Sequence, residues 1–390
     1  MSGMARMDFA RPTSLAQALA LAQPDPRAMG VDSADGRLWL AGGQSLLAAL
    51  KLGMVAPSLL IDLQDVSGLR DIRLTDSGDA LSIGAMATHA SVAASDVVKH
   101  WAPGLAALAG GIADAQVRQM GTLGGSLAHN DPAACWPAGV LAAGATVLTS
   151  RREIAVDDYF RALYTTTLGP GELILGVRFP RLKGLHYLKF EQAASRFALV
   201  GVAVAVLGDA RVRVAITGLG QGVRRWREAE HALQSGFATE ALQPLLERGL
   251  PGLEALGDLH ASADYRRHLA GVLTQRCVSA LGGGPLPQRA PLSRRSPNSA
   301  APTEVQKAPR EGFGGTELLP ASPAQVWHTL LDPARLQASI PGCESLAQVR
   351  ADAFEATIKV GLGPLAMRFK TDVQLLSLIH ISEPTRPERI

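Results

Sequence analysis

Two glycine pairs, each beside a small hydroxyl residue, constrain the fold of this 390-residue chain more than any other feature. The first lies in residues 41–45, between an apolar run at 38–40 and a helical pattern at 46–50. The second lies in residues 122–126. A strand that turns sharply into a helix exposes backbone N–H groups, and glycine lets the backbone approach an anion closely. Two such loops can bind both phosphates of a dinucleotide.

Taken alone, each pair is equally compatible with a tight turn that only requires a positive φ. Neither pair belongs to a G-x-G-x-x-G motif, and neither ends in the Gly-Lys-Ser/Thr of a Walker loop. The pattern is therefore typical neither of a nicotinamide dinucleotide site nor of a nucleoside triphosphatase.

Composition and charge exclude several classes of protein. A net charge of +3, with no basic run interleaved with aromatic residues, argues against a nucleic-acid partner. Residues 1–8 lack the apolar core of a secretory signal, so we expect a cytoplasmic protein. The most apolar stretch, residues 132–148, is interrupted by Pro137 and predicts a buried helix and strand instead of a membrane span.

The cysteines do not form a recognisable metal-binding pattern. Cys135, Cys277 and Cys343 are far apart in the sequence. An iron–sulfur cluster needs four ligands, usually closely spaced. We therefore expect reduced thiols and no metal site.

Hydrophobic periodicity predicts two α/β regions followed by an α+β region. The first region has a helix at 14–21, with Thr13 as its N-cap, and a βαβ unit at 37–41, 45–52 and 59–63. The second combines strands at 81–86, 146–150 and 172–179 with helices at 91–98 and 105–113. Strands at 187–192, 198–207 and 211–219 then form an antiparallel meander, and helices follow at 224–233, 239–248 and 264–281.

The two glycine loops, in this order, resemble the FAD-binding medium subunit of molybdenum hydroxylases, the family of the aerobic carbon monoxide dehydrogenase medium chain and the xanthine dehydrogenase flavin subunit. Segments 83–89, 112–121, 187–190 and 198–203 match in the same order, and the resemblance runs from about residue 8 to 281. It implies an α+β protein. Residues 1–180 would form a two-subdomain FAD-binding fold of the vanillyl-alcohol-oxidase/PCMH type (about 1–55 and 56–180), and residues 181–283 a cap domain with a three-stranded antiparallel sheet.

The resemblance also implies non-covalently bound FAD and no catalytic side chain. Loop 41–45 would hold one phosphate, loop 122–126 the other phosphate and the ribityl chain, and the strand at 187–190 would reach the isoalloxazine. The expected cofactor contacts are Ala41, Gly42, Gly43, Gln44, Ser45, Thr122, Leu123, Gly124, Gly125, Ser126, Asp131, Tyr187 and Lys189. Cys135 stands where many relatives carry an acidic residue, which puts one contact to a cofactor hydroxyl in doubt.

Considered without the family, some of these residues have simpler roles. Lys189 would be a solvated strand residue, and Tyr187 a core or interface aromatic. His129 and Asp131, just beyond the second loop, fit a turn as well as a cofactor contact. His89 is expected to be a buried histidine whose hydrogen bonds are satisfied.

In function, the resemblance implies an electron-transfer subunit of a multisubunit molybdenum hydroxylase. Electrons would pass from the iron–sulfur clusters of a two-cluster small subunit through FAD to an external acceptor, after substrate oxidation on a large subunit with the molybdenum cofactor. The alternative is a non-catalytic protein that binds a lipid or a membrane partner and retains vestigial flavin loops. Carbon monoxide, a purine, an aldehyde or an N-heterocycle all remain open as the substrate.

The C-terminal part has a separate character. Residues 284–312 form a linker with six prolines between Pro285 and Pro309. Residues 313–375 resemble a truncated form of CoxG, the helix-grip protein of carbon monoxide dehydrogenase, with strands expected at 315–319, 354–360 and 366–373 and a helix from Pro323. Any membrane contact would be peripheral and come through this module. Residues 376–390 match the translation of a sequencing adapter, so we interpret them as an artefact, with an ordinary terminal strand as the alternative.

Overall fold

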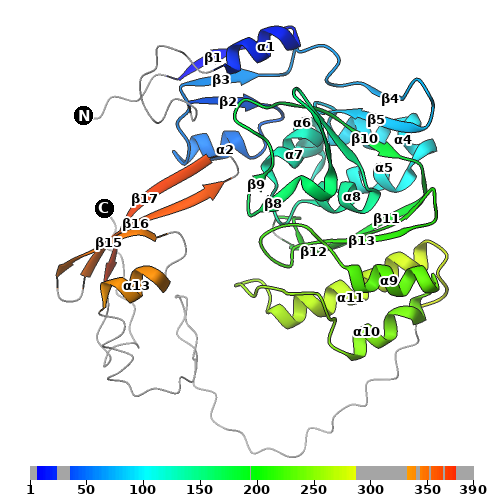
Figure 1. Cartoon of the computed structure of the whole chain (residues 1–390). Helices are drawn as coiled ribbons and strands as arrows, with labels where there is room; N and C mark the ends of the chain where they lie inside the picture. The colour runs from blue at the N-terminus through cyan, green and yellow to red at the C-terminus, as the bar shows by residue number, and fades with distance from the viewer. Residues whose placement is uncertain are drawn as a thin grey trace, which may run out of the picture. The chain divides into compact units, whose positions relative to one another are not determined.

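The computed structural model describes residues 7–23, 36–193, 195–286, 332–339, 343–350, 353–362 and 365–374. It contains two compact units, the larger one comprising Met1–Pro287 and the smaller one lying within residues 288–390. In the larger unit three sheets follow one another along the chain (Figure 1).

The first sheet is parallel and has the strand order β1-β3-β2, with β1 at Asp8–Ala10, β2 at Arg37–Leu40 and β3 at Leu59–Asp62. Helix α2 (Leu46–Lys51) connects β2 to β3, so the predicted βαβ unit is confirmed. Helix α1 (Leu15–Ala22) has Ser14 as its N-cap, and the prediction of Thr13 was wrong. The reason is local: the Thr13 N–H donates to the Gln17 side chain at 3.0 Å, which leaves the capping position to Ser14.

The second sheet is antiparallel, with the order β4-β5-β10-β6-β7. Its strands are β4 (Ile72–Leu74), β5 (Ala80–Gly84), β6 (Thr146–Thr149), β7 (Glu153–Ala155) and β10 (Ile174–Pro180). The helices of this subdomain are α3 (His89–Ala94), α4 (Asp96–Trp101), α5 (Pro103–Gly110), α6 (Ala115–Met120), α7 (Leu123–His129) and α8 (Cys135–Ala143). A 3₁₀ turn, η1 (Val156–Asp158), precedes the small hairpin of β8 (Phe160–Ala162) and β9 (Thr165–Thr166).

Every residue of α8 is buried, which confirms that the apolar stretch 132–148 is a core helix followed by a strand. Pro137 is tolerated because it lies in the first turn, where a helix has N–H groups without intrahelical partners. Helix α8 therefore provides a rigid apolar support for the elements packed around it.

The third sheet belongs to the cap domain and has the antiparallel order β11-β12-β13-β14. Its strands are β11 (Leu182–Glu191), β12 (Ala198–Leu207), β13 (Val212–Thr217) and β14 (Arg224–Arg225). Only three strands were predicted, because two arginines carry no apolar alternation. The cap helices are α9 (Arg227–Ser235), α10 (Gln243–Glu247) and α11 (Ala263–Ala280), with a 3₁₀ turn η2 at Thr239–Leu242.

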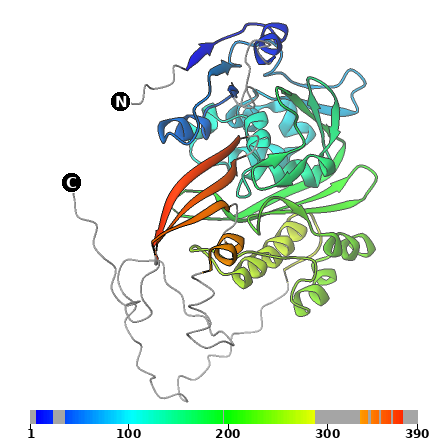
Figure 2. The same cartoon turned by 60° about the vertical axis from the view of Figure 1, so that its left-hand side comes forward.

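Helices cover both faces of the cap sheet (Figure 2). Ala203, Ala205 and Ala215 point into the core that contains α8, whereas Val202 and Val204 point into the core of the cap helices. Strand β12 is thus buried on both sides, which explains its unbroken apolar sequence.

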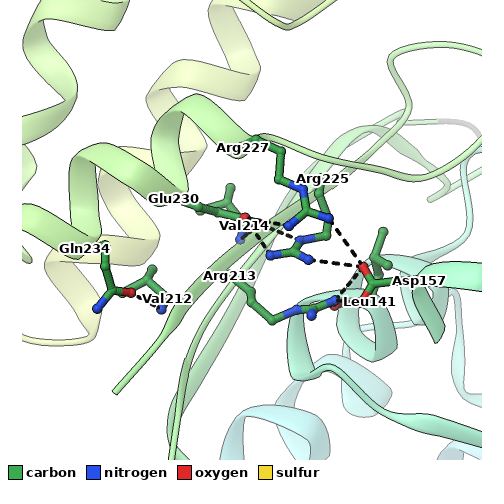
Figure 3. Close-up of polar contacts among 9 residues, drawn as sticks. All are labelled: Leu141, Asp157, Val212, Arg213, Val214, Arg225, Arg227, Glu230 and Gln234. Atoms are coloured by element: carbon green, nitrogen blue, oxygen red, sulfur yellow. Dashed lines mark hydrogen bonds and ion pairs between the residues drawn. The ribbon is translucent and has the colours of Figure 1, made fainter. Parts of the chain in front are cut away.

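An ionic cluster fastens the cap to the second subdomain (Figure 3). Arg213 of β13 donates to both carboxylate oxygens of Asp157 at 2.9 Å and to the Leu141 carbonyl at 2.7 Å. Arg225 of β14 bridges Asp157 at 3.1 Å and Glu230 at 2.6 Å. The cap therefore holds the carboxyl end of α8, where a cation also interacts favourably with the helix dipole.

The smaller unit contains α13 (Pro333–Ser339) and a sheet of order β15-β16-β17. The strands span Cys343–Arg350, Ala353–Leu362 and Leu365–Gln374, and β16 and β17 contain the strands predicted at 354–360 and 366–373. The strand predicted at 315–319, the helix predicted from Pro323, most of the linker and residues 376–390 lie outside the described residues.

The ionic cluster leads to a prediction about stability. Partial burial opposes ionisation of Asp157, but the hydrogen bonds and charges of Arg213 and Arg225 together lower its pKa below the usual value. We expect Asp157→Asn to destabilise the protein by about 1–2 kcal/mol, the low end for a charged hydrogen-bond partner, because the carboxylate is 38% exposed and so screened by solvent.

Thermal unfolding over a range of pH measures this contribution. A lowered native pKa means that the stabilisation is complete above the pKa of the unfolded state, near 4, and is lost as the pH falls through the native value. The difference between wild type and Asp157→Asn should therefore be constant from about pH 5 to 8 and shrink in acid. The neighbouring Asp158→Asn is the control, and an equal effect of both variants would contradict the assignment.

Candidate functional site

The fold brings the two glycine pairs into direct contact. A side chain on Gly42 would overlap with the carbonyl oxygen of Met120 and lie 2.9 Å from the Cα of Gly121. A side chain on Gly125 would lie 3.5 Å from the Cβ of Ala41. Loop 41–45 therefore rests on the segment that leads into α7, and Gly42 is needed for this close approach.

Loop 41–45 exposes a row of unpaired backbone donors. Gly43 has a φ of +70°, which turns the chain from β2 into α2. Within the described part of the chain, the N–H groups of residues 42–46 have no acceptor, and the first helical bond joins the Leu47 N–H to the Gly43 carbonyl at 3.0 Å. Gln44 and Ser45 are exposed beside these donors. Such a concave run of N–H groups binds an anion without a basic residue.

The second glycine pair differs from the expectation. It is not a loop but the first turn of α7, with the Thr122 side chain as N-cap. Four consecutive N–H groups already have acceptors: Leu123 donates to Ala87 at 3.0 Å, Gly124 to Ala85 at 2.8 Å, and both Gly125 and Ser126 to Thr122, at 3.1 and 3.0 Å. Oriented amides at this pair therefore cannot serve a second phosphate in this arrangement, and the Ser126 hydroxyl is what the turn still offers.

Gly124 serves packing. A side chain there would lie 2.8 Å from the carbonyl oxygen of Ala85 and 2.6 Å from its Cβ. The glycine thus allows α7 to lie against the end of β5, which places the start of α7 beside loop 41–45. The sequence identified the right residue, but its role is helix packing.

Tyr187 and Lys189 project from β11 on the face of the cap sheet that meets the second subdomain. The Tyr187 hydroxyl is buried without a hydrogen-bond partner among the described residues, and burial raises its pKa well above the ordinary value. The neighbouring thiol of Cys135 also has a raised pKa because of burial, so it stays protonated. An unpaired buried hydroxyl is costly unless a ligand satisfies it.

Lys189 is neither solvated nor a free cation. Its side chain is 7% exposed, and its ammonium group donates to the Arg196 carbonyl at 2.8 Å and pairs with Glu191 at 3.2 Å. These contacts tie β11 to the start of β12. No sequence pattern indicated this pairing, because Arg196 acts through its backbone.

The segment after α7 contains residues that the sequence left undecided. Asp131 accepts a hydrogen bond from the Ala133 N–H at 2.8 Å, which is a turn role. The His129 ring lies 5.0 Å from the ring of Tyr164, and burial lowers the pKa of His129 against the opposing effect of Asp131. Asn130, between them, adopts a left-handed φ of +49° and binds the carbonyls of the β8–β9 hairpin. Neither Asn130 nor Tyr164 was predicted from the sequence.

His89 is buried as predicted, and its Nδ1 accepts a hydrogen bond from Trp136 at 3.1 Å. Trp136 was not identified from the sequence as a partner, since the two residues are far apart along the chain. In the part of the chain that the structure describes, no group of acidic, histidine or cysteine residues is arranged to bind a metal ion. None of the helices described there is long and apolar enough to cross a membrane.

These features fit a dinucleotide with a pyrophosphate. Gly42 and Gly43 form a cradle that side chains would fill, and the N–H groups of residues 42–46 point to an anion. The unpaired Tyr187 hydroxyl adds a polar group at the cap.

Comparison with known proteins supports the same assignment. Residues 5–182 match the FAD binding domain in molybdopterin dehydrogenase, and residues 186–281 match the CO dehydrogenase flavoprotein C-terminal domain. Residues 315–383 match the carbon monoxide dehydrogenase protein CoxG.

Among curated relatives, the nicotine 6-hydroxylase medium subunit of Paenarthrobacter nicotinovorans is 38% identical over 253 residues, which cover 62% of this chain and 89% of the relative. The carbon monoxide dehydrogenase medium chain of Hydrogenophaga pseudoflava is 32% identical and is covered to 96%, with 70% of this chain aligned.

Two solved structures resemble the fold. Carbon monoxide dehydrogenase from Hydrogenophaga pseudoflava superposes with a TM-score of 0.64 at 32% identity, over 71% of this chain and 97% of that chain. Quinoline 2-oxidoreductase from Pseudomonas putida 86 gives 0.59 at 29% identity, over 71% and 98%. The chain therefore has a PCMH-type FAD-binding fold, binds FAD, and belongs to the family of FAD-binding medium subunits of molybdenum hydroxylases, as an oxidoreductase subunit.

Proposed function

We propose that this chain is the electron-transfer subunit of a cytoplasmic molybdenum hydroxylase, in which FAD passes electrons from the iron–sulfur clusters of a small subunit to an external acceptor. The observation that carries the proposal is the row of unpaired N–H groups at residues 42–46, beside the start of α7. It supplies a phosphate site, while the chain's described residues supply no acid–base machinery around it.

We assign the cofactor contacts as follows. Loop 41–45 binds the pyrophosphate through its backbone, with the exposed Gln44 and Ser45 side chains as further donors. The start of α7 contributes the Thr122 and Ser126 side chains and shapes the site through its packed glycines. FAD supplies the redox chemistry, since it accepts and releases electrons singly or in pairs. The complete proposed set is Ala41, Gly42, Gly43, Gln44, Ser45, Thr122, Leu123, Gly124, Gly125, Ser126, Asp131, Tyr187 and Lys189.

The cap contributes polarity near this site. Lys189 is held by Glu191 and the Arg196 carbonyl, so its charge is balanced within the hairpin. Tyr187 keeps an unpaired, protonated hydroxyl beside Cys135. A neutral phenol and a neutral thiol give a less anionic surrounding than a carboxylate at position 135 would, and this favours retention of negative charge on a reduced flavin.

The partners follow from the same assignment. The names of the relatives, "medium subunit" and "medium chain", support an assembly with a large and a small subunit. We propose a molybdenum-cofactor large subunit and a two-cluster iron–sulfur small subunit for this chain.

Co-expression with these subunits tests the proposal. We expect the three chains to co-purify with one FAD per complex, and the flavin absorbance to bleach when the isolated iron–sulfur subunit is added in reduced form. Denaturation should release all flavin into solution. A purified chain without flavin, or flavin that stays oxidised in the presence of the reduced small subunit, would contradict the function.

The phosphate cradle predicts a glycine requirement. Gly43 and Gly53 have nearly the same positive φ, +70° and +67°, and they flank the same helix, α2. Alanine at either position carries a similar backbone strain, roughly 1–2 kcal/mol. Only Gly43 lies in the cradle, whereas a side chain on Gly53 would meet nothing within 4 Å.

We therefore expect Gly43→Ala to weaken FAD binding at least tenfold and Gly53→Ala to leave it within about twofold, a loss of about 1.4 kcal/mol separating the two. Titration of each apoprotein with FAD, followed by flavin fluorescence, gives the dissociation constants. Equal affinities would show that the first glycine pair is only a turn.

The flavin-binding unit also has a testable boundary. Thr239 of the cap donates its N–H to the Gly283 carbonyl at 2.8 Å and its hydroxyl to the Pro285 carbonyl at 2.7 Å. The cap thus includes Pro285, just beyond the boundary at residue 283 expected from the sequence. We propose that the CoxG-like module is dispensable for the flavin fold and makes any membrane contact on its own.

Truncation after Leu286 should retain full FAD content and the wild-type melting temperature of the flavin unit, because the hydrogen bonds that anchor the cap are kept. Truncation after Leu281 removes both acceptors of Thr239 and should lower the melting temperature. Differential scanning fluorimetry with and without FAD compares the two. Loss of FAD from the longer fragment would place the C-terminal module inside the flavin fold.

A further inference from the structure

The ring of His89 lies between α8 and the segment that leads into α7, and the family assignment leaves it without a role. His89 is the first residue of α3 and is 5% exposed. Its backbone N–H donates to the Gly121 carbonyl at 2.9 Å, and its Nδ1 lies 3.1 Å from the indole nitrogen of Trp136. Both contacts fix the ring in one orientation.

The contact with Trp136 determines where the histidine carries its proton. An indole nitrogen can only donate a hydrogen bond, so Nδ1 of His89 must be the acceptor. The proton of the neutral ring is therefore on Nε2. Burial, assisted by the charge of Arg118, lowers the pKa of His89 to about 4, so the ring stays neutral in the cell.

The Nε2 proton has no acceptor among the described residues. Nε2 lies against Gly121, where an added side chain would be 2.8 Å from it. On the other side, Gly42 of the phosphate cradle packs against the same residue, with a would-be side chain 2.9 Å from the Gly121 Cα. One glycine thus separates the unpaired donor from the row of free N–H groups at residues 42–46.

We propose that His89 is a neutral hydrogen-bond donor to FAD, directing its Nε2 proton to the pyrophosphate beside Gly121, with Trp136 holding the ring in place. The proposal rests on the cofactor site assigned above. It explains why position 121 is a glycine beside this ring. It also compensates in part for α7, whose first four N–H groups are already used within the protein.

The competing role for His89 is packing alone, as a wedge between α3, α8 and the start of α7. Two substitutions separate the roles, because asparagine places its amide near Nδ1 and glutamine near Nε2. His89→Asn keeps an acceptor for Trp136 but removes the donor at Nε2. His89→Gln keeps a donor at Nε2 but loses the acceptor at Nδ1.

We expect the two variants to rank in opposite orders in two measurements. By thermal unfolding of the apoprotein, His89→Asn should be the more stable, since Trp136 remains paired. By titration of the apoprotein with FAD, His89→Asn should bind roughly tenfold or more weakly than wild type, as expected for a lost hydrogen bond to a charged acceptor, and His89→Gln within about threefold of wild type. His100→Asn, at an exposed histidine of α4, is the control and should match wild type in both.

FAD affinity of His89→Asn equal to that of wild type would overturn the proposal, as would affinities that simply follow the stabilities of the variants. If His89→Asn fails to fold, His89→Gln decides: near-wild-type affinity despite the lost Trp136 bond supports the donor role, and a tenfold loss refutes it. Absence of FAD binding by wild type itself would instead refute the cofactor site.

Discussion

The contact between loop 41–45 and the segment leading into α7 is the constraint on which the flavin site depends. Gly42 lies so close to the Met120 carbonyl that no side chain fits between them. This contact joins the parallel sheet of the first subdomain to the helices of the second. It also leaves the N–H groups of residues 42–46 turned away from any protein acceptor in the described chain. A cofactor phosphate satisfies these donors, so binding and subdomain closure are coupled.

Helix α8 extends this arrangement to the cap. Its first residues, Cys135 and Trp136, lie beside Tyr187 and His89, and the carbonyl of Leu141 near its other end accepts hydrogen bonds from Arg213. Because α8 is buried throughout, a shift at one end is transmitted to the other. The ionic cluster around Asp157 therefore helps to position groups near the flavin although it lies outside the cofactor site.

The two glycine pairs show how one sequence pattern can serve two physical purposes. In the first, glycine provides a left-handed turn and leaves the amides free. In the second, Thr122 caps a helix and Gly124 allows that helix to approach β5, so the amides are used internally. Sequence spacing alone does not distinguish these cases, because both begin as a small hydroxyl residue beside two glycines.

Local sequence determined much of the fold. The βαβ unit, the buried helix and strand in residues 132–148, and strands β12 and β13 follow from apolar periodicity and turn residues, and the ordered motifs identify the family. Tertiary structure decided what depends on distant partners. It closed β14 onto β13, paired Lys189 with Glu191 and Arg196, and brought Trp136 to His89. It also decided which glycine pair keeps free amides, since a donor is free only when no acceptor elsewhere in the folded chain reaches it.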